Sequence, residues 1–167
     1  GVNDYKNNKA DEVSGFKTLK QLGVPVPEIK GNLSFLLGER SAMIMEFIPG
    51  TTFHRNRLDT VLEDNFDTGV EQLKEELCLA LRTDEPEVLD RVTQAQLNVE
   101  AIIGLERTPF YIRDLQIQIS EETGRAVIID PTISAKTAYP EEYGQTTIYI
   151  AALNEALTQI IEGLVES

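Results

Sequence analysis

The segment YIRDLQIQISEETGRAVIID, residues 111–130, decides the fold of this 167-residue chain. Polar and apolar residues alternate over 116–120, which predicts a β-strand with one buried face. The following Glu122-Thr123-Gly124 is typical of a tight turn, because glycine readily adopts the positive φ that such turns require. The apolar run 126–129 predicts a second, buried strand. We therefore predict a β-hairpin over these residues.

An aspartate stands at each outer end of the predicted hairpin, Asp114 before its first strand and Asp130 after its second. The outer ends of paired antiparallel strands meet, so we expect the two carboxylates to lie near each other. Two carboxylates beside a strand pair are a compact way to bind a metal ion together with a phosphate group.

This arrangement resembles the catalytic loop and metal-binding hairpin of the protein kinase and aminoglycoside phosphotransferase superfamily. The resemblance implies that Asp114 is the catalytic aspartate and that Asp130 holds Mg²⁺. It also implies that Arg113 braces the catalytic loop by pairing with an anion.

The chain departs from the family pattern at the metal site. The pattern places a metal-binding Asn five residues after the catalytic Asp, where this chain has Ile119. The loop is about two residues short against that pattern, so Gln116 or Gln118 is the expected substitute ligand. In addition, Ile112 replaces the usual His, and Pro131 follows the second aspartate where the family has Phe.

Upstream, the segment LGVPVPEI, residues 22–29, is similar to the link that follows helix C in the phosphotransferases. Glu12 stands 13 positions before Pro25, as the helix-C glutamate does in that family. The resemblance therefore implies a role for Glu12 in the nucleotide site. Taken alone, Glu12 is a carboxylate near the start of a helix, stabilised by the helix dipole.

The string MEFIPG, residues 45–50, is similar to the strand and hinge that carry adenine in the phosphotransferases. The resemblance implies that Glu46 and Ile48 offer main-chain contacts to ATP. Without the resemblance, the same string is a buried strand that ends in a Pro-Gly turn.

Apolar spacing and turn residues predict the remaining elements. Helices are expected over 7–22, from Asn65 to Leu81, from an N-cap at Thr83 or Asp84 to about Leu105, and over 147–165; an antiparallel hairpin is expected over 33–37 and 42–47, and a loop over 131–146.

Composition narrows the classes of protein that fit the chain. The net charge is −13, and the acidic residues are spread over the helices, which argues against a nucleic-acid-binding surface. The apolar runs fall short of the roughly 18 residues that span a bilayer, so we expect no membrane partner. The single cysteine, Cys78, indicates a buried thiol in a reducing cytoplasm. The single histidine, His54, is expected on the surface and provides no zinc site.

Together these features predict an α+β, kinase-like domain over residues 1–167. Residues 1–48 would form a partial N-lobe and hinge, a helix with antiparallel strands, and residues 49–167 a shortened, mainly helical C-lobe. A Gly-rich phosphate loop and its strand lysine do not occur in the sequence.

Two functions stay open at this point. One is phosphotransfer from ATP, with Mg²⁺, to an unidentified hydroxyl acceptor. The other is a catalytically inactive kinase-like module whose acidic surface binds a basic protein partner.

Overall fold

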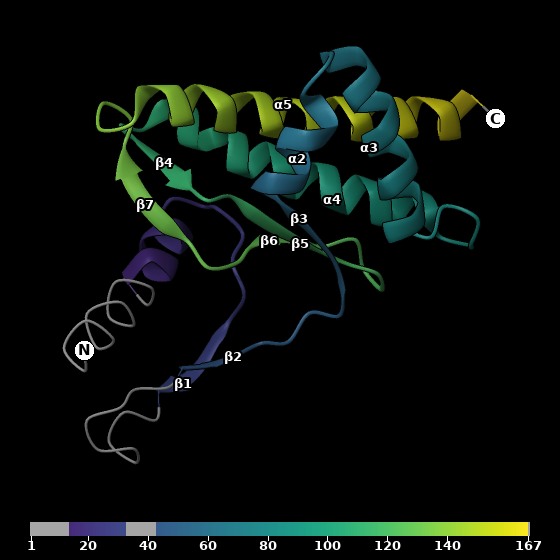
Figure 1. The fold of residues 1–167 in the computed structure, drawn as a ribbon. Helices are drawn as coiled ribbons and strands as arrows, with labels where there is room; N and C mark the ends of the chain where they lie inside the picture. The colour runs from purple at the N-terminus through teal and green to yellow at the C-terminus, as the bar shows by residue number, and fades with distance from the viewer. Residues whose placement is uncertain (1–13, 33–42, 167) are drawn as a thin grey trace.

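A computed structural model of the chain describes residues 14–32 and 43–166 (Figure 1). Glu12 and the strand predicted over 33–37 therefore lie outside the described residues. The described chain combines α-helices with small antiparallel sheets, which confirms the α+β class.

The elements follow one another in a mixed order. They are β1 (Ile29–Asn32), β2 (Met43–Met45), β3 (Gly50–His54), α2 (Arg55–Leu62), α3 (Phe66–Ala80), α4 (Val88–Ile103), the 3₁₀ helix η1 (Gly104–Arg107), β4 (Phe110–Arg113), β5 (Gln116–Ser120), β6 (Ala126–Ile128), β7 (Thr132–Ala135) and α5 (Pro140–Glu166). Residues 14–21 are also helical and end before Gly23, whose φ is +81°. This end agrees with the predicted stop.

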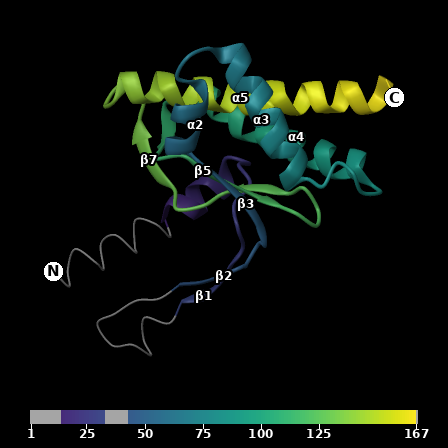
Figure 2. The same cartoon turned by 45° about the vertical axis from the view of Figure 1, so that its right-hand side comes forward.

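α2, α3, α4 and α5 gather on one side of the three-stranded sheet β3-β5-β6, and the β1-β2 hairpin projects away from them (Figures 1 and 2). α5 crosses the top of the molecule and packs against α2, α3 and α4. The core between these layers is aliphatic, with Leu73, Leu77, Val99, Leu153 and Leu157 almost fully buried. Burial of each such leucine or valine stabilises the fold by about 1.5–3 kcal/mol.

The hairpin that decides the fold is present as predicted. β5 pairs with β6, and Gly124 has φ +78° in the turn between them. The edge of β6 that does not face β5 is covered by the segment before β1, because the Ile128 N–H donates to the Pro25 carbonyl at 3.0 Å. The helix over 14–21 reaches the same region, where Gly15 lies close to Pro131.

Several predicted elements and boundaries were wrong. β1, β3, α2 and β4 occupy stretches in which no strand or helix was predicted, and both β7 and the start of α5 at Pro140 lie in the loop expected over 131–146. α4 starts later than predicted, after Glu87 with a left-handed backbone, because the preceding turn forms hydrogen bonds with the Arg91 side chain. Leu89 and Leu97 of α4, although apolar, are 43% and 56% exposed.

α5 is long and apolar enough, by length and composition, to cross a membrane. Its apolar residues Ala152, Leu153, Ala156 and Leu157 are instead buried against the other helices. A core helix of a folded domain passes the same test of length and composition, so this helix does not indicate a membrane partner.

Candidate functional site

The two predicted site aspartates interrupt a single antiparallel ribbon. β4 pairs with β7, in which Arg113 lies opposite Thr132, and β5 pairs with β6, in which Ile117 lies opposite Ile128. Three residues lie between the first pair and the second on each strand, so the register is the same on both sides of the gap. The Ile129 N–H still donates to the Gln116 carbonyl at 3.1 Å, so the ribbon opens around residues 114–115 and 130–131.

Asp114 and Asp130 both have a left-handed backbone, with φ +48° at each position. Such a conformation is uncommon for residues other than glycine, although aspartate tolerates it better than most. Within the preserved register Asp114 lies opposite Pro131, the residue that follows Asp130. Both side chains are exposed. The closeness of the two carboxylates stays a prediction.

His54 contacts Asp114, which the sequence analysis did not anticipate. Its Nδ1 accepts a hydrogen bond from the Asn56 N–H at 3.0 Å, where His54 caps the start of α2. A neutral imidazole with an accepting Nδ1 carries its proton on Nε2. That Nε2 lies 3.4 Å from Oδ1 of Asp114. His54 thus lies beside the predicted catalytic carboxylate.

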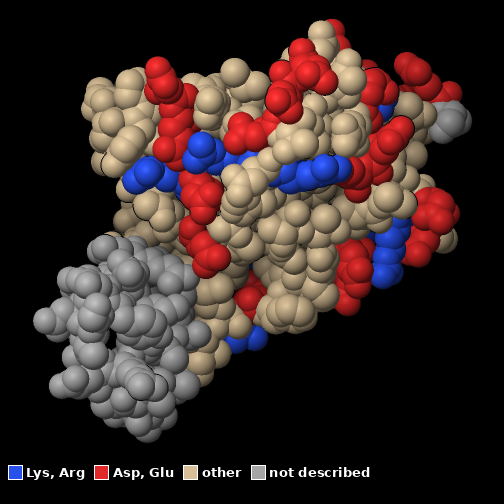
Figure 3. Space-filling view, viewed as in Figure 1, with Lys and Arg blue, Asp and Glu red and all other residues tan. Residues whose placement is uncertain are grey.

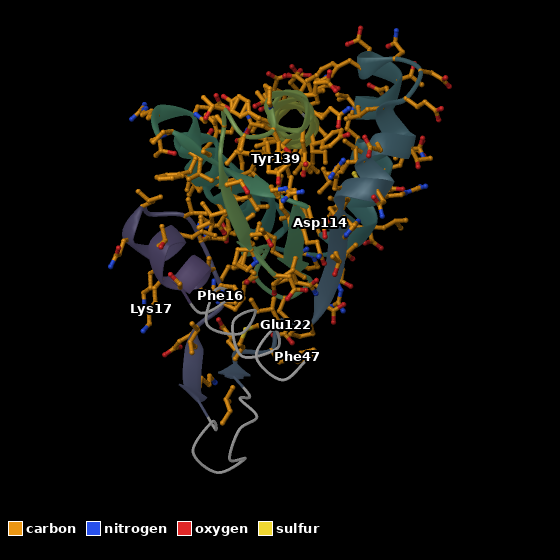
Figure 4. All side chains as sticks on the ribbon, turned by 60° about the vertical axis from the view of Figure 1, so that its left-hand side comes forward. Phe16, Lys17, Phe47, Asp114, Glu122 and Tyr139 are labelled. Atoms are coloured by element: carbon orange, nitrogen blue, oxygen red, sulfur yellow. The ribbon has the colours of Figure 1, made fainter. Side chains whose placement is uncertain are left out.

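Arg113 pairs with an anion, as the resemblance implies, and the anion is Glu142 of α5. The Arg113 Nε lies 3.5 Å from Glu142 Oε2, and the Arg55 Nη1 donates to Glu142 Oε1 at 3.0 Å. The Arg113 guanidinium also stacks over the Tyr139 ring, 3.9 Å from its centroid. Figure 4 labels Tyr139 together with Asp114, the residue that follows Arg113. These contacts anchor the end of β4 to the start of α5, and Asp114 follows this anchored residue directly.

The two candidate glutamines differ in their surroundings. Gln116 begins β5 opposite His54, beside the gap in the ribbon. Gln118 lies farther along β5, and its amide is already in use: Nε2 donates to the Ile48 carbonyl at 3.0 Å, and Oε1 accepts from the Thr52 hydroxyl. Of the two, Gln116 is the one placed near the aspartates.

The predicted adenine contacts are engaged within the protein. The Glu46 N–H donates to the Glu28 carbonyl at 2.8 Å, and the Ile48 carbonyl accepts from Gln118. The Glu46 carboxylate accepts two hydrogen bonds from Arg125 Nη1, both 2.7 Å long, and one from the Glu28 N–H. This carboxylate therefore ties the segment after β2 to the β5-β6 hairpin.

The hydrogen bond from Arg125, followed by that from the Glu28 N–H, holds the pKa of Glu46 below its usual value. A carboxyl group with a lowered pKa in the folded state stabilises the fold above its unfolded-state pKa, and the stabilisation is lost as the pH falls through its folded-state pKa. Glu46→Gln should therefore reduce the free energy of unfolding by about 1 kcal/mol at pH 7.

Urea unfolding between pH 7 and pH 3 checks this expectation. The difference between wild type and Glu46→Gln should shrink as the pH falls and Glu46 becomes protonated. The exposed Glu63→Gln variant serves as the matched control, with little effect at either pH. A pH-independent loss in Glu46→Gln would contradict a role for the charge.

Within residues 14–32 and 43–166, no group of three or more His, Cys, Asp or Glu side chains is arranged to hold a metal ion. Magnesium does not require such a group, because it is commonly held by one or two carboxylates together with water and substrate phosphates. Asp114 and Asp130 fit that donor set.

A comparison of the sequence with known protein families finds no matching family, and no curated protein matches it significantly.

Proposed function

We propose that this chain is a kinase-like phosphotransferase whose reaction centre lies at the gap between Asp114 and Asp130. The observation that carries the proposal is the pair of aspartates with left-handed backbones at one break of an otherwise regular ribbon. Unusual backbone conformations of this kind cluster at active sites and ligand clamps. Few residues suffice for phosphoryl transfer, because positioning and charge neutralisation account for most of its catalysis.

Each residue at the gap has a chemical role in this proposal. Asp130, with Gln116 beside it, would hold the magnesium ion of Mg-ATP, which supplies the phosphoryl group and neutralises its charge. Asp114 would orient the acceptor hydroxyl and take its proton. The Nε2 atom of His54 lies 3.4 Å from Asp114 Oδ1 and would help to position that carboxylate. Arg113 holds the loop through Glu142 and does not need to touch the substrate.

The resemblance to a nucleotide hinge receives less support. Both the Glu46 N–H and the Ile48 carbonyl have partners within the protein. We therefore expect phosphate and metal contacts, rather than these two main-chain groups, to dominate nucleotide affinity.

The engaged hinge groups favour a second candidate, the catalytically inactive kinase-like module that binds a basic protein. On the side of the protein seen in Figure 3, acidic side chains flank a row of Lys and Arg side chains. A basic partner would therefore meet alternating charge on that face and not a single acidic patch.

Thermal unfolding with and without Mg-ATP separates the two candidates. For a nucleotide concentration about 100 times the Kd, binding stabilises the folded state by about 2.7 kcal/mol, which raises the Tm by about 5 °C or more. Asp130→Asn should abolish this shift. Asparagine tolerates the left-handed backbone as aspartate does, so the variant should keep the fold. Asp64→Asn, an exposed aspartate on another part of the surface, should leave the shift unchanged.

Asp114→Asn adds a test of catalysis. It should retain the nucleotide-dependent shift and lose the transfer of labelled phosphate to any acceptor that the wild type uses. No shift in the wild type at millimolar Mg-ATP, or an equal shift in Asp130→Asn, would count against the phosphotransferase and favour the inactive module.

A further inference from the structure

A shallow groove lies between α2 and the first half of α5; we call it the α2–α5 groove. It consists of two adjoining hollows of about 430 and 480 Å³, which share Gln145 and are open to solvent. The starts of both helices line one hollow, and their later turns line the other. The two helices therefore run in the same direction along the groove, for about two helical turns or roughly 12 Å.

One wall of the groove is a single face of α2. Arg55, Asp59, Leu62 and Glu63 follow the spacing i, i+4, i+7 and i+8, which places them on one side of a helix. Arg55 is the only cation among the described residues that line the groove, and it already pairs with Glu142 at 3.0 Å and lies 3.9 Å from Asp59. The last turn of α2 contains no basic residue, although the negative end of the helix dipole favours a cation there. This wall is therefore short of positive charge towards Glu63.

The other wall is a face of α5 with the same spacing. Glu141, Gln145, Ile148 and Tyr149 occupy positions i, i+4, i+7 and i+8. Ile148 is 49% exposed, and it lines the same hollow as Leu62 of the opposite wall. These two aliphatic side chains form an apolar patch that water reaches. An apolar side chain of a partner would remove that surface from water, which favours binding.

Carboxylates stand on both walls around this apolar patch. Glu142 is held by two arginines, whereas Glu63 and Glu141 are exposed and have no hydrogen-bond or ion-pair partner within residues 14–32 and 43–166. With Asp59, four carboxylates face one guanidinium, so the groove is negative. It would repel a second copy of this chain, whose net charge is −13, and attract a basic partner.

We propose that the α2–α5 groove binds a short basic segment of another protein, in which one aliphatic side chain is flanked by Lys or Arg. The aliphatic side chain would lie against Leu62 and Ile148, and the flanking cations beside Glu63 and Glu141. A groove of roughly 12 Å holds about four residues of extended chain. The proposal gives the basic partner of the second candidate function a place and a chemistry, and it does not rest on phosphotransfer at the aspartate gap.

Fluorescence anisotropy with a labelled, end-blocked peptide of four lysines around a central leucine tests the proposal. We expect saturable binding that weakens when NaCl is raised from about 50 mM to about 500 mM, because salt screens exposed charges. A peptide with glycine in place of the leucine should bind about three- to tenfold more weakly. A peptide with glutamates in place of the lysines should not bind.

Charge reversal at Glu63 tests the location. Glu63→Lys should weaken binding of the lysine peptide by about two- to tenfold. Glu122→Lys is the matched control, because Glu122 is also exposed and its reversal changes the net charge equally. Glu122 lies in the turn between β5 and β6, well away from Tyr139 at the edge of the groove (Figure 4), so this variant should bind nearly as well as the wild type. Glu141→Lys is an independent variant with the same expected loss as Glu63→Lys.

Ile148→Ala tests the apolar contact and should weaken binding by about three- to tenfold. Its control is Leu79→Ala, which truncates a leucine of α3 that is 82% exposed and should leave binding unchanged. Both side chains are exposed, so both variants should keep the fold.

Three results would overturn the proposal. The first is no saturable binding of the lysine peptide at millimolar protein. The second is an equal loss in Glu63→Lys and Glu122→Lys, which would mean attraction by net charge alone. The third is a dimer in analytical ultracentrifugation that Ile148→Ala dissociates, because a second copy would then occupy the groove. Nucleotide is absent from these measurements, so their outcome is independent of the Mg-ATP test.

Discussion

Replacing Arg91 with methionine is expected to lower the free energy of unfolding by about 3 kcal/mol or more. Arg91 is a buried residue of α4 whose guanidinium donates to three carbonyl oxygens: Leu81 at 2.8 Å, Arg82 at 2.7 Å and Pro86 at 2.8 Å. Two of these carbonyls lie directly after α3, where the helix dipole is negative and favours a cation. Methionine retains the apolar stem and removes all three hydrogen bonds.

Urea unfolding followed by circular dichroism measures this loss. Arg91→Lys should lose less of the free energy of unfolding than Arg91→Met and still be less stable than the wild type. A compact ammonium group cannot reach all three carbonyls, whereas a guanidinium has a donor nitrogen for each. The control is Arg82→Met, which removes a partly exposed arginine with ion pairs to Glu85 and Glu121 and should cost less than about 1 kcal/mol. Similar losses for Arg91→Met and Arg82→Met would show that the buried hydrogen bonds contribute little.

Gly124→Ala is the second substitution with a large expected effect, about 3 kcal/mol of destabilisation. Gly124 has φ +78°, which costs any other residue about 1 kcal/mol. A Cβ at this position would also lie 2.0 Å from the Arg91 carbonyl oxygen, which is backbone and cannot move aside alone. Relief of this clash requires the hairpin to separate from α4, which adds a cost of about 1–3 kcal/mol.

Gly23→Ala separates these two contributions. Gly23 has a similar φ, +81°, but nothing lies within 4 Å of its Cβ position. We therefore expect only the conformational cost there, about 1 kcal/mol. Thermal unfolding of both variants makes the comparison, and equal losses would rule out the contact with α4 as the main cause at Gly124.

The sequence predicted the elements whose signals are local. The β5-β6 hairpin shows alternation followed by a glycine turn, and α3 shows an apolar stripe after Asn65, whose side chain accepts hydrogen bonds from the Asp67 and Thr68 N–H groups. β3 gave no such signal, because Gly50-Thr51-Thr52 is polar. It is a strand because it pairs with β5, more than 60 residues later.

Some features of the candidate site could likewise be predicted from local sequence, and others could not. Asp114 and Asp130 flank one hairpin, so a short segment of sequence was enough to predict the element that carries both of them. The contact of His54 with Asp114, and the anchoring of Arg113 by Glu142, join residues from separate elements. No spacing rule connects such residues. The ion pair between Glu46 and Arg125, 79 positions apart, was missed for the same reason.

The unchanged register of the interrupted ribbon determines which side chains positions 114 and 130 can accept. Both strands have the same number of residues through the gap, so neither end of the ribbon shifts when the gap is open. The paired strands on either side of the gap, together with the core beneath them, fix the position of the backbone at the two aspartates. Side chains at positions 114 and 130 can therefore be exchanged for others that tolerate a left-handed backbone, which makes this gap a position where new chemistry can be installed without redesign of the fold.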